Sequence, residues 1–419
     1  MRHGFPGATR RWAAASRTRS ARRASRTERA KHDSQGRRII VTPDNGAPAL
    51  HPTHHPTHQA TRGGGDGMAG DMTLATGLAT ATTQLALKGD ARIRKVKRAE
   101  PKVVVAPAKP NALMRWSPSV RVETCATEVM SRLWFGGGAL WSVNPGAAPP
   151  QNGKREVELT ELIEMTAPAD GPAIDFQIDE TARAASTRPD RMAEILSQMD
   201  DLWPYWTSIT GIDPAQAPRT AEVVAVAQLV GERVVMQFKN HLAVRRPVQR
   251  SALVGPMIDT PGHGSLPSGH AMQAFMVAAV LSRLLGLDPK KEDPPLTSRL
   301  LRRLARRIAH NRVVAGVHFP MDSLAGCLLG DVLGEFLAGL GAQENFAYCG
   351  SNFNGGAVKT EEDSRAQLQL ETLDVDTPSG LKGSAAEVGA DRFVPTGGGL
   401  FRSLWDAASA ELALQQPFA

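Results

Sequence analysis

The stretch TAEVVAVAQLVGERVVMQF, from Thr220 to Phe238, carries the pattern that decides the fold class. Its apolar residues recur at intervals of three and four, which places them on one face of an α-helix. Thr220 is a suitable N-cap, because its hydroxyl can accept a backbone N–H of the first turn. We therefore expect an amphipathic helix that begins at Thr220 and buries its apolar face in a core.

Three later stretches have the same helical character. We expect helices from Ser268 to about Leu287, from Thr297 to about His310 and from Pro320 to about Leu340. Few segments after Leu113 alternate apolar and polar residues as half-buried strands do, so the predicted fold class is all-α, a helical bundle. One face of the last helix carries three small residues that allow a neighbouring helix to pack closely, namely Gly326, Gly330 and Gly334.

Composition divides the chain into three parts. Residues 1–110 are rich in Arg and Ser, then in His, Pro and Thr, then in Gly, and finally in Lys, Ala and Pro. Such compositions bury too little apolar surface to offset chain entropy, so we expect a disordered basic tail. Residues 111–344 form the expected helical domain. Residues 345–419 form a polar tail, in which 400–414 has the pattern of an amphipathic helix that docks back on the bundle.

The positive charge of the chain belongs to its start. Residues 1–32 contain ten Lys and Arg and one Glu, a net +9, so the rest of a chain of net charge +7 sums to −2. We therefore do not expect nucleic acid as a partner of the helical domain. Cys125, Cys327 and Cys349 are far apart and include no C-x-x-C pair, which favours a reducing compartment over a disulfide framework or a zinc site.

No stretch contains the eighteen or so uncharged apolar residues that a membrane span requires. Residues 271–281 are too short, and residues 319–342 are interrupted by Asp322, Asp331 and Glu335. The Arg-rich start lacks the apolar region of a signal peptide. We expect a soluble, cytoplasmic protein and leave open whether it is a homo-oligomer.

Polar residues that suit chemistry gather in the middle of the chain. The five histidines outside the tail fall between residues 241 and 318. In the same window Lys239 and Arg246 are seven positions apart, which puts both on one side if the first helix continues that far. Pro247 then disfavours helical geometry at Arg246 and turns the chain. The pair forms either a cationic clamp or part of a solvated basic face.

The segment Pro267-Ser-Gly-His270 enters an apolar helix. Ser268 can cap that helix, and Gly269 permits close approach to its free N–H groups, which favour an anion. His270 then stands within reach of a bound group. The alternative is an ordinary serine cap followed by a histidine with no role.

A third segment places an arginine in the core. Leu300, Leu304 and Ile308 form a stripe at fourfold spacing, and Arg312 is the next position on it. An inward-facing arginine needs an anionic partner. His318 lies just before the Pro320 helix, and an aspartate in its first turn, Asp322, can accept from one ring nitrogen and leave the other for a ligand or substrate. A capping carboxylate beside a packed imidazole would give the same sequence. The four remaining arginines of the stretch are expected to face water, namely Arg302, Arg303, Arg306 and Arg307.

Together the three segments resemble a family signature. Lys239-(x6)-Arg246-Pro247, Pro267-Ser268-Gly269-His270 and Arg312-(x5)-His318-(x3)-Asp322 occur in the order found in the superfamily of type 2 phosphatidic acid phosphatases, bacterial class A acid phosphatases and vanadium-dependent haloperoxidases. The resemblance covers about residues 220–341. One departure is Asn311 before Arg312, where the family usually has serine.

The resemblance implies a role for each matched residue, at a site formed by helix ends. Lys239, Arg246 and Arg312 would hold the oxygens of a tetrahedral oxyanion, and Ser268 with the Gly269 N–H would complete the cradle. His318 would attack phosphorus, or bind vanadate as its ligand in a haloperoxidase. Asp322 would orient His318, and His270 would act as general acid and base.

The same motifs fit three functions. The first is a metal-independent phosphohydrolase that acts on a phosphoester through a phosphohistidine and needs no cofactor. The second is a haloperoxidase that uses vanadate, hydrogen peroxide and a halide; His263 favours it, because its position resembles one that lines the halide pocket, whereas Leu266 stands where an aromatic residue is common. The third is a catalytically dead domain with a nucleic-acid-binding basic tail.

Overall fold

The structure is a computed structural model, and it describes the helical region almost throughout. The described residues are 39–41, 113–145, 155–288, 293–342, 346–347, 351–363, 386–388, 392–393 and 399–415. Residues 1–110, for which we predicted disorder, lie outside the described residues, except for the short strand β1 (Ile39–Val41). Of the cysteines, Cys125 and Cys327 are buried free thiols, whereas Cys349 lies outside the described residues.

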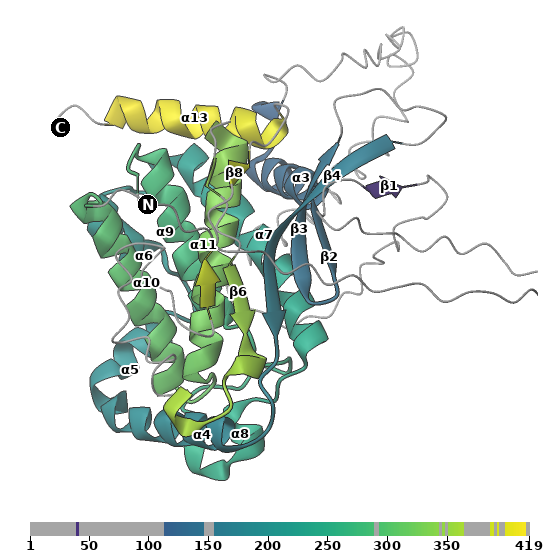
Figure 1. The fold of residues 1–419 in the computed structure, drawn as a ribbon. Coiled ribbons are helices and arrows are strands. Elements are labelled where there is room, and N and C mark those ends of the chain that lie inside the picture. Colours follow the sequence, from purple (N-terminus) through teal and green to yellow (C-terminus); the bar gives the residue numbers. More distant parts are fainter. Residues whose placement is uncertain are drawn as a thin grey trace, which may run out of the picture.

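The described part of the chain is mainly a bundle of helices, which confirms the predicted class (Figure 1). The helices are α3 (Pro118–Met130), α4 (Pro172–Ala184), α5 (Arg188–Ser197), α6 (Trp203–Thr210), α7 (Pro218–Leu242), α8 (Pro247–Arg250), α9 (Gly269–Leu284), α10 (Leu296–Val314), α11 (Pro320–Ala342) and α13 (Leu400–Gln415). Short 3-10 turns are η2 (Ala185–Thr187), η3 (Ala252–Val254) and η4 (Gly355–Ala357).

Helices α9 and α11 form the centre of the core. A Cβ added at Gly326 would lie 2.5 Å from the Ser268 carbonyl oxygen, and one at Gly334 would lie 2.6 Å from the Cβ of Ala279. The glycine face of α11 therefore lets α9 approach closely, as its spacing predicted. Most residues of α9 are buried on all sides, because α7, α10 and α11 surround it.

Helix α11 is also a candidate membrane span by length and composition, and no other helix in the described ranges qualifies. The acidic residues that argued against a span, Asp331 and Glu335 among them, are too few to exclude it on this measure. Its apolar window is completely buried inside the protein. A central helix of a globular core has the same properties, so this is weak evidence for a membrane.

Two helix boundaries and one exposure differ from the predictions. Helix α7 begins at Pro218, two residues before the predicted start, and Thr220 does not cap it. Helix α10 continues to Val314, so Arg312 is helical and, as predicted, buried. Arg302 was expected to face water, which is wrong: it is buried, its Nη2 donates to Asp331 at 2.9 Å, and its guanidinium lies over the Phe275 ring.

A small sheet beside α3 and α7 was not predicted. Its order is β2-β3-β4-β6-β7, with β1 paired to β4. The strands are β2 (Leu133–Gly136), β3 (Ala139–Pro145), β4 (Arg155–Thr166), β6 (Ser351–Asn354) and β7 (Ala386–Val388), and a separate pair is formed by β5 (Phe346–Ala347) and β8 (Arg392–Phe393).

A bulge interrupts the alternating pattern of β4. Leu140 pairs with Ile163 and Trp141 pairs with Glu161, so Leu162 is an extra residue in the ladder. Leu162 and Ile163 are consecutive and both buried. The shift in the middle of the strand divides its alternation into two short pieces, which weakens the sequence signal for a strand.

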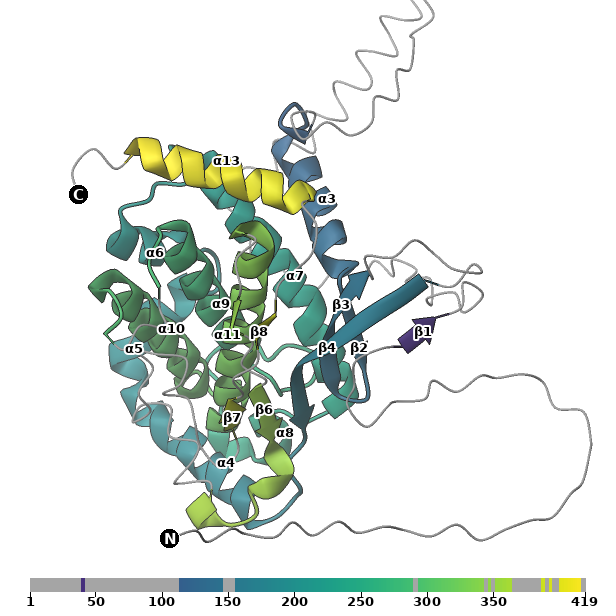
Figure 2. The ribbon, with the colours of Figure 1, turned by 45° about the horizontal axis from the view of Figure 1, so that its top comes forward.

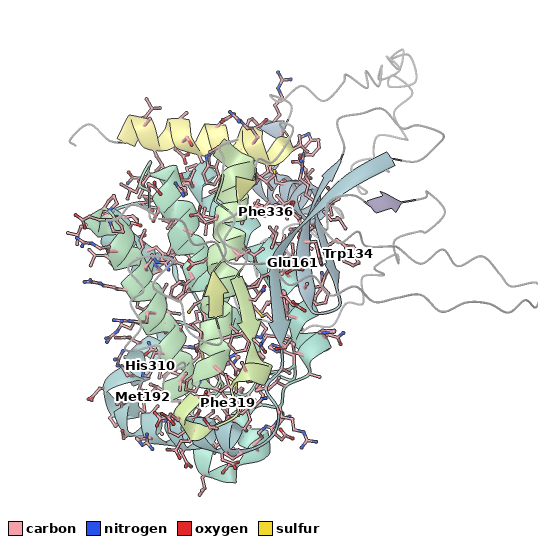
Figure 3. The ribbon with its side chains drawn as sticks, viewed as in Figure 1. Trp134, Glu161, Met192, His310, Phe319 and Phe336 are labelled. Atoms are coloured by element: carbon pink, nitrogen blue, oxygen red, sulfur yellow. The ribbon has the colours of Figure 1, made fainter. Side chains whose placement is uncertain are left out.

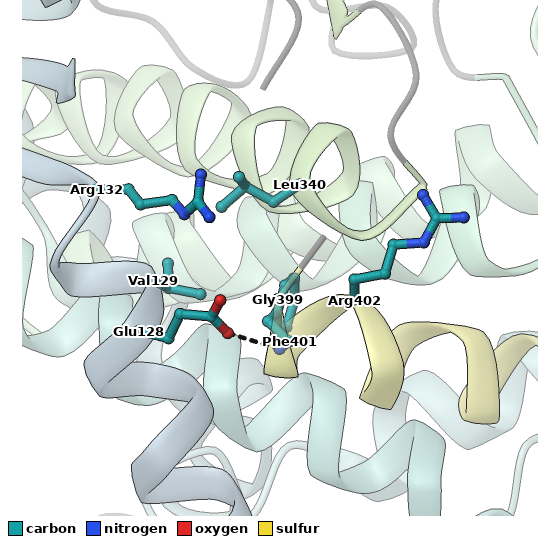
Figure 4. Close-up of a pocket in the computed structure, with 7 residues that line it drawn as sticks. All are labelled: Glu128, Val129, Arg132, Leu340, Gly399, Phe401 and Arg402. Carbon is teal, nitrogen blue, oxygen red and sulfur yellow. Dashed lines mark hydrogen bonds between the residues drawn. The ribbon is translucent and has the colours of Figure 1, made fainter. Parts of the chain in front are cut away.

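The amphipathic helix expected at residues 400–414 is confirmed as α13. It lies across one end of the bundle, away from α4 and α8 (Figure 2), and its buried residues include Leu404, Trp405 and Leu412. At two of its contacts, with α3 and with α7, a carboxylate accepts hydrogen bonds from the N–H groups at a helix start. The Phe401 N–H, at the start of α13, donates to Glu128 of α3 at 2.8 Å, beside a small pocket (Figure 4).

At the other contact Glu411 caps α7, which has no side-chain cap of its own. It accepts hydrogen bonds from the backbone N–H groups of Arg219 and Thr220 and from the Thr220 hydroxyl. A carboxylate at a helix N-terminus satisfies unpaired donors and complements the helix dipole. Helix α13 is therefore joined to α7 by a cap as well as by apolar packing.

Replacing Glu411 by alanine is expected to lower the free energy of unfolding by about 1–2 kcal/mol, the usual effect of losing an N-cap. Urea unfolding of the full chain, followed by circular dichroism, measures it. Asp406→Ala is the matched control on the same helix, because exposed Asp406 pairs with half-buried Arg402 and its loss should change stability by less than about 0.5 kcal/mol. Equal effects of the two substitutions would contradict the capping role.

Candidate active site

The three motif segments meet at the end of the bundle opposite α13. They comprise the end of α7 with the loop after it, the start of α9, and the end of α10 with the start of α11. Phe319, His310 and Met192 lie toward this end of the bundle, whereas Phe336 lies toward the other end of α11 (Figure 3). Each segment is at or beside a helix end, which agrees with the predicted placement of the site.

Lys239 and Arg246 reach the site by a turn, so the condition that the first helix continues as far as Arg246 is not met. Helix α7 ends at Leu242, and Ala243 adopts a left-handed conformation with φ of 50°. The Lys239 Nζ donates to the carbonyl oxygens of Gly264 and Ser265, both at 3.0 Å. A Cβ at Gly264 would lie 2.8 Å from the Lys239 carbonyl oxygen, so glycine is needed for the loop to pass this close.

Arg246 is the central cation of the site. It has extended backbone geometry before Pro247, as predicted, and its side chain is buried. Its Nη1 donates to the Val317 carbonyl oxygen at 2.7 Å and lies 2.9 Å from His318 Nε2. Its Nε donates to the His263 carbonyl oxygen, and its Nη2 lies 3.1 Å from His263 Nδ1. One guanidinium therefore joins both histidines.

The contacts of His318 define its tautomer. A guanidinium can only donate, so the contact with Arg246 requires a lone pair on His318 Nε2. The proton of the neutral ring is then on Nδ1, which donates to Asp322 Oδ2 at 3.0 Å. The predicted pairing of His318 with Asp322 is present, and the nitrogen with the lone pair faces the cations.

Ser265 belongs to the same network, although the sequence motifs did not single it out. Its hydroxyl donates to Asp322 Oδ2, which also accepts the Phe319 N–H at 2.9 Å. Burial raises the pKa of Asp322, while these two hydrogen bonds and the charges of Lys239 and Arg246 oppose the rise. Three donors converge on one carboxylate oxygen and hold it against the imidazole.

Arg312 is buried in the site with only part of its donor set in use. Its Nη2 donates to the Ile195 carbonyl oxygen at 3.1 Å and to Gln198 Oε1 at 2.9 Å. Its Nε and Nη1 are buried and have no hydrogen-bond partner in the described structure. Buried donors are rarely left unpaired in folded proteins, so this arginine is arranged for an additional acceptor.

The start of α9 lies against the other two segments. Ser268 caps α9 by accepting from the Ala271 N–H at 3.4 Å, as predicted, and its own N–H donates to the Asp322 carbonyl oxygen at 2.8 Å. A Cβ added at Gly269 would meet nothing within 4 Å, so the first turn of α9 faces open space. His270 Nε2 is 3.3 Å from the Gln198 carbonyl oxygen. A carbonyl only accepts, so Nε2 carries a proton.

The other histidines divide into two groups. His263 contacts Arg246 and therefore lies in the site. His241 does not: it is at the exposed end of α7, with its ring 6.0 Å from that of Phe135 in β2. The site thus gathers three of the five clustered histidines, namely His263, His270 and His318.

Charge and burial shift the pKa values of the whole group. Burial lowers the pKa of both Arg246 and Arg312 to about 10, so both remain charged at neutral pH. Burial and the charge of Arg246 lower the pKa of Lys239. Burial is also the largest cause that lowers the pKa of His318, followed by the charges of Arg246 and Lys239. An anion placed among these groups would oppose every one of these shifts.

The lowered pKa of His318 predicts a loss of stability in acid. Below the ordinary value of 6.5 the unfolded chain binds a proton at His318 that the folded protein does not, so stability falls as the pH drops below about 6.5. This one group contributes a slope of at most about 1.4 kcal/mol per pH unit. Urea unfolding at pH 7 and pH 5 should therefore show a smaller acid loss in His318→Gln than in wild type. Identical losses of stability in the two proteins would contradict a lowered pKa of His318.

No group of three or more His, Cys, Asp or Glu in the described ranges is placed to hold a metal ion. The side chains that converge on the site supply positive charge instead, and the donor set of Lys239, Arg246 and Arg312 suits a tetrahedral oxyanion such as phosphate or vanadate.

Parts of the chain are similar to known proteins. Over 120 residues the chain is 28% identical to decaprenylphosphoryl-5-phosphoribose phosphatase from two strains of Mycobacterium tuberculosis, over 28% of this chain and 60% of that protein. The chain thus spans 60% of the length of these curated relatives. A bacterial vanadium-dependent iodoperoxidase superposes with a TM-score of 0.32 and 18% identity, over 41% of this chain and 51% of the other.

A family match covers all three motif segments. Residues 219–341 match the model of the PAP2 superfamily, from the second residue of α7 to the last turn of α11. The matched region contains every residue of the site that the sequence predicted. Over residues 219–341 this chain is therefore similar to the PAP2 superfamily.

Proposed function

We propose that this protein is a metal-independent phosphohydrolase that cleaves phosphoesters through a phosphohistidine at His318. The observation that carries the proposal is the buried, partly unpaired cation cluster. Arg312 has two buried donors without partners, and the charges of two further buried cations, Lys239 and Arg246, act on one carboxylate, Asp322. Uncompensated buried charge is costly, so the cluster is suited to a bound dianion. The phosphatase activity named for the mycobacterial relatives supports hydrolysis.

In the proposed reaction each of these residues has a step. The lone pair of His318 Nε2 attacks phosphorus, the bond from phosphorus to the ester oxygen breaks, and protonated His270 gives its proton to the leaving oxygen. Neutral His270 then takes a proton from water, the water oxygen attacks phosphorus, and the bond to His318 breaks to release phosphate. Asp322 holds Nδ1–H and stabilises the charge that develops on the ring.

Substrate has to redirect Arg246. The Arg246 Nη1 occupies the lone pair of His318 Nε2 at 2.9 Å, so the nucleophile is hydrogen-bonded before substrate arrives. A phosphate oxygen is a stronger, charged acceptor for the same donor. Binding of substrate would therefore turn Arg246 toward the phosphate and expose the lone pair for attack.

Purified protein assayed with p-nitrophenyl phosphate tests the proposal. We expect release of phosphate without added metal, in the presence of a chelator, and competitive inhibition by orthovanadate. A protein that hydrolyses none of a panel of phosphomonoesters and lipid phosphates would exclude the hydrolase.

A haloperoxidase is the second candidate, and His263 is the residue that supports it. Its ring lies 3.1 Å from Arg246 Nη2, beside the cradle that would hold vanadate with His318 as its ligand. Vanadate, when bound, would supply the chemistry that activates peroxide. This reading requires bromination of monochlorodimedone only when orthovanadate, hydrogen peroxide and bromide are all present, and an altered rate in His263→Ala.

The third candidate, a dead domain with a nucleic-acid-binding tail, would give the opposite pattern. Substitutions in the cradle would leave every assay unchanged, and salt-dependent DNA binding would disappear when residues 1–67 are removed.

We further propose that residues 111–344 form the catalytic domain and that the protein is located in the cytoplasm.

A further inference from the structure

Gln198, at the end of α5, connects two of the motif segments. Its Oε1 accepts hydrogen bonds from Arg312 Nη2 at 2.9 Å and from Asn311 Nδ2 at 3.1 Å. Its backbone carbonyl oxygen lies 3.3 Å from His270 Nε2. Gln198 is buried, with only 2% of its surface exposed. Gln198 thus lies between the arginine of the third motif and the histidine of the second.

The orientation of the Gln198 amide follows from its partners. Arg312 can only donate, so the amide oxygen must face it. Asn311 also donates, because its Nδ2 is identified by a second bond, at 2.9 Å, to the carboxylate of Glu194. With Oε1 fixed between these two donors, the Gln198 Nε2 points elsewhere. It is buried and has no hydrogen-bond partner in the described structure.

The unpaired donors form a group. Gln198 Nε2, Arg312 Nε and Arg312 Nη1 belong to two side chains that are hydrogen-bonded to each other. A buried amide donor without a partner is unfavourable, because it has lost its hydrogen bonds to water. Three such donors at one end of the bundle are best explained by one shared acceptor.

We propose that Gln198 is part of the oxyanion site, where Oε1 positions Arg312 and Nε2 donates to the bound anion. The inference rests on the proposed function, since it assumes that the cradle binds phosphate or a mimic of it. Glutamine suits both tasks, because it offers an acceptor to the arginine and a donor to the anion without adding charge. A carboxylate at this position would also accept from Arg312, but it would repel the anion.

The two tasks can be separated by two substitutions of similar volume. Gln198→Glu keeps the acceptor for Arg312 and removes the donor, whereas Gln198→Met removes both. If Gln198 only positions Arg312, glutamate should restore wild-type behaviour. If Nε2 donates to the anion, glutamate should be the worse of the two, because a negative charge then faces the ligand.

The experiment measures how orthovanadate raises the melting temperature of the full chain, which reports binding without relying on turnover. We expect the apparent Kd for vanadate to rise about tenfold in Gln198→Met and about a hundredfold in Gln198→Glu, in line with the loss of a neutral donor and the addition of a repelling charge. Inhibition of p-nitrophenyl phosphate hydrolysis by vanadate should follow the same order.

Ser197→Ala is the matched control, since Ser197 is the exposed neighbour whose hydroxyl contacts Tyr205, and it should bind vanadate like wild type. A Gln198→Glu protein that binds vanadate within threefold of wild type overturns the donor role. If wild type itself is not stabilised by vanadate or phosphate, the proposed function fails. If wild type is stabilised and both variants match it, only the inference about Gln198 fails.

Discussion

Replacement of His318 by alanine is expected to lower kcat for p-nitrophenyl phosphate by about 10³-fold or more, because it removes the nucleophile. The ring is held at both nitrogens, by Asp322 at Nδ1 and by Arg246 at Nε2. Nε2 is the nitrogen that would form the bond to phosphorus, and no other described side chain occupies that place between Arg246 and Asp322.

Acid-quenched wild-type enzyme incubated with ³²P-labelled substrate should contain an acid-labile, base-stable phosphoryl group, and His318→Ala should contain none. His241→Ala is the control, because His241 lies at the exposed end of α7 outside the cradle and its loss should leave turnover within about twofold. Turnover above a tenth of wild type in His318→Ala would exclude the phosphohistidine.

Replacement of Arg246 by lysine is expected to lower kcat/KM by about 10²–10³-fold, similar to the loss of an oxyanion-hole donor. The guanidinium donates from three nitrogens toward Val317, His263 and His318. An ammonium has its donors on a single atom and cannot span these acceptors. The charge is kept, so the substitution tests geometry and not net charge.

Arg245→Lys is the matched control for Arg246→Lys, because it makes the same change at the adjacent, exposed position. Thermal unfolding of both proteins shows whether the cradle variant is folded, and vanadate inhibition shows whether the anion site is damaged. Arg246→Lys with wild-type kcat/KM would show that the fork geometry of Arg246 has no part in catalysis.

The sequence predicted the helices of the matched region because their signals are local. Apolar spacing in residues 220–238, the serine cap at Ser268 and the proline at the start of α11 act within one or two turns of the chain. The sheet was missed for a related reason: the bulge at Leu162 breaks the alternation on which strand prediction depends. Arg302 was misplaced because its partner, Asp331, lies on another helix.

The motif residues of the site were also determined by sequence alone, namely Lys239, Arg246, Ser268, Gly269, His270, Arg312, His318 and Asp322. Their order and spacing are readable without a structure. What only the tertiary structure decided is how they are connected. The turn at Ala243, and not a continuous helix, brings Arg246 to His318, and Ser265 and Gln198 enter the site through contacts 57 and 114 residues away in sequence. Hydrogen bonds between such distant residues depend on how helices pack, and no local pattern in the chain records them.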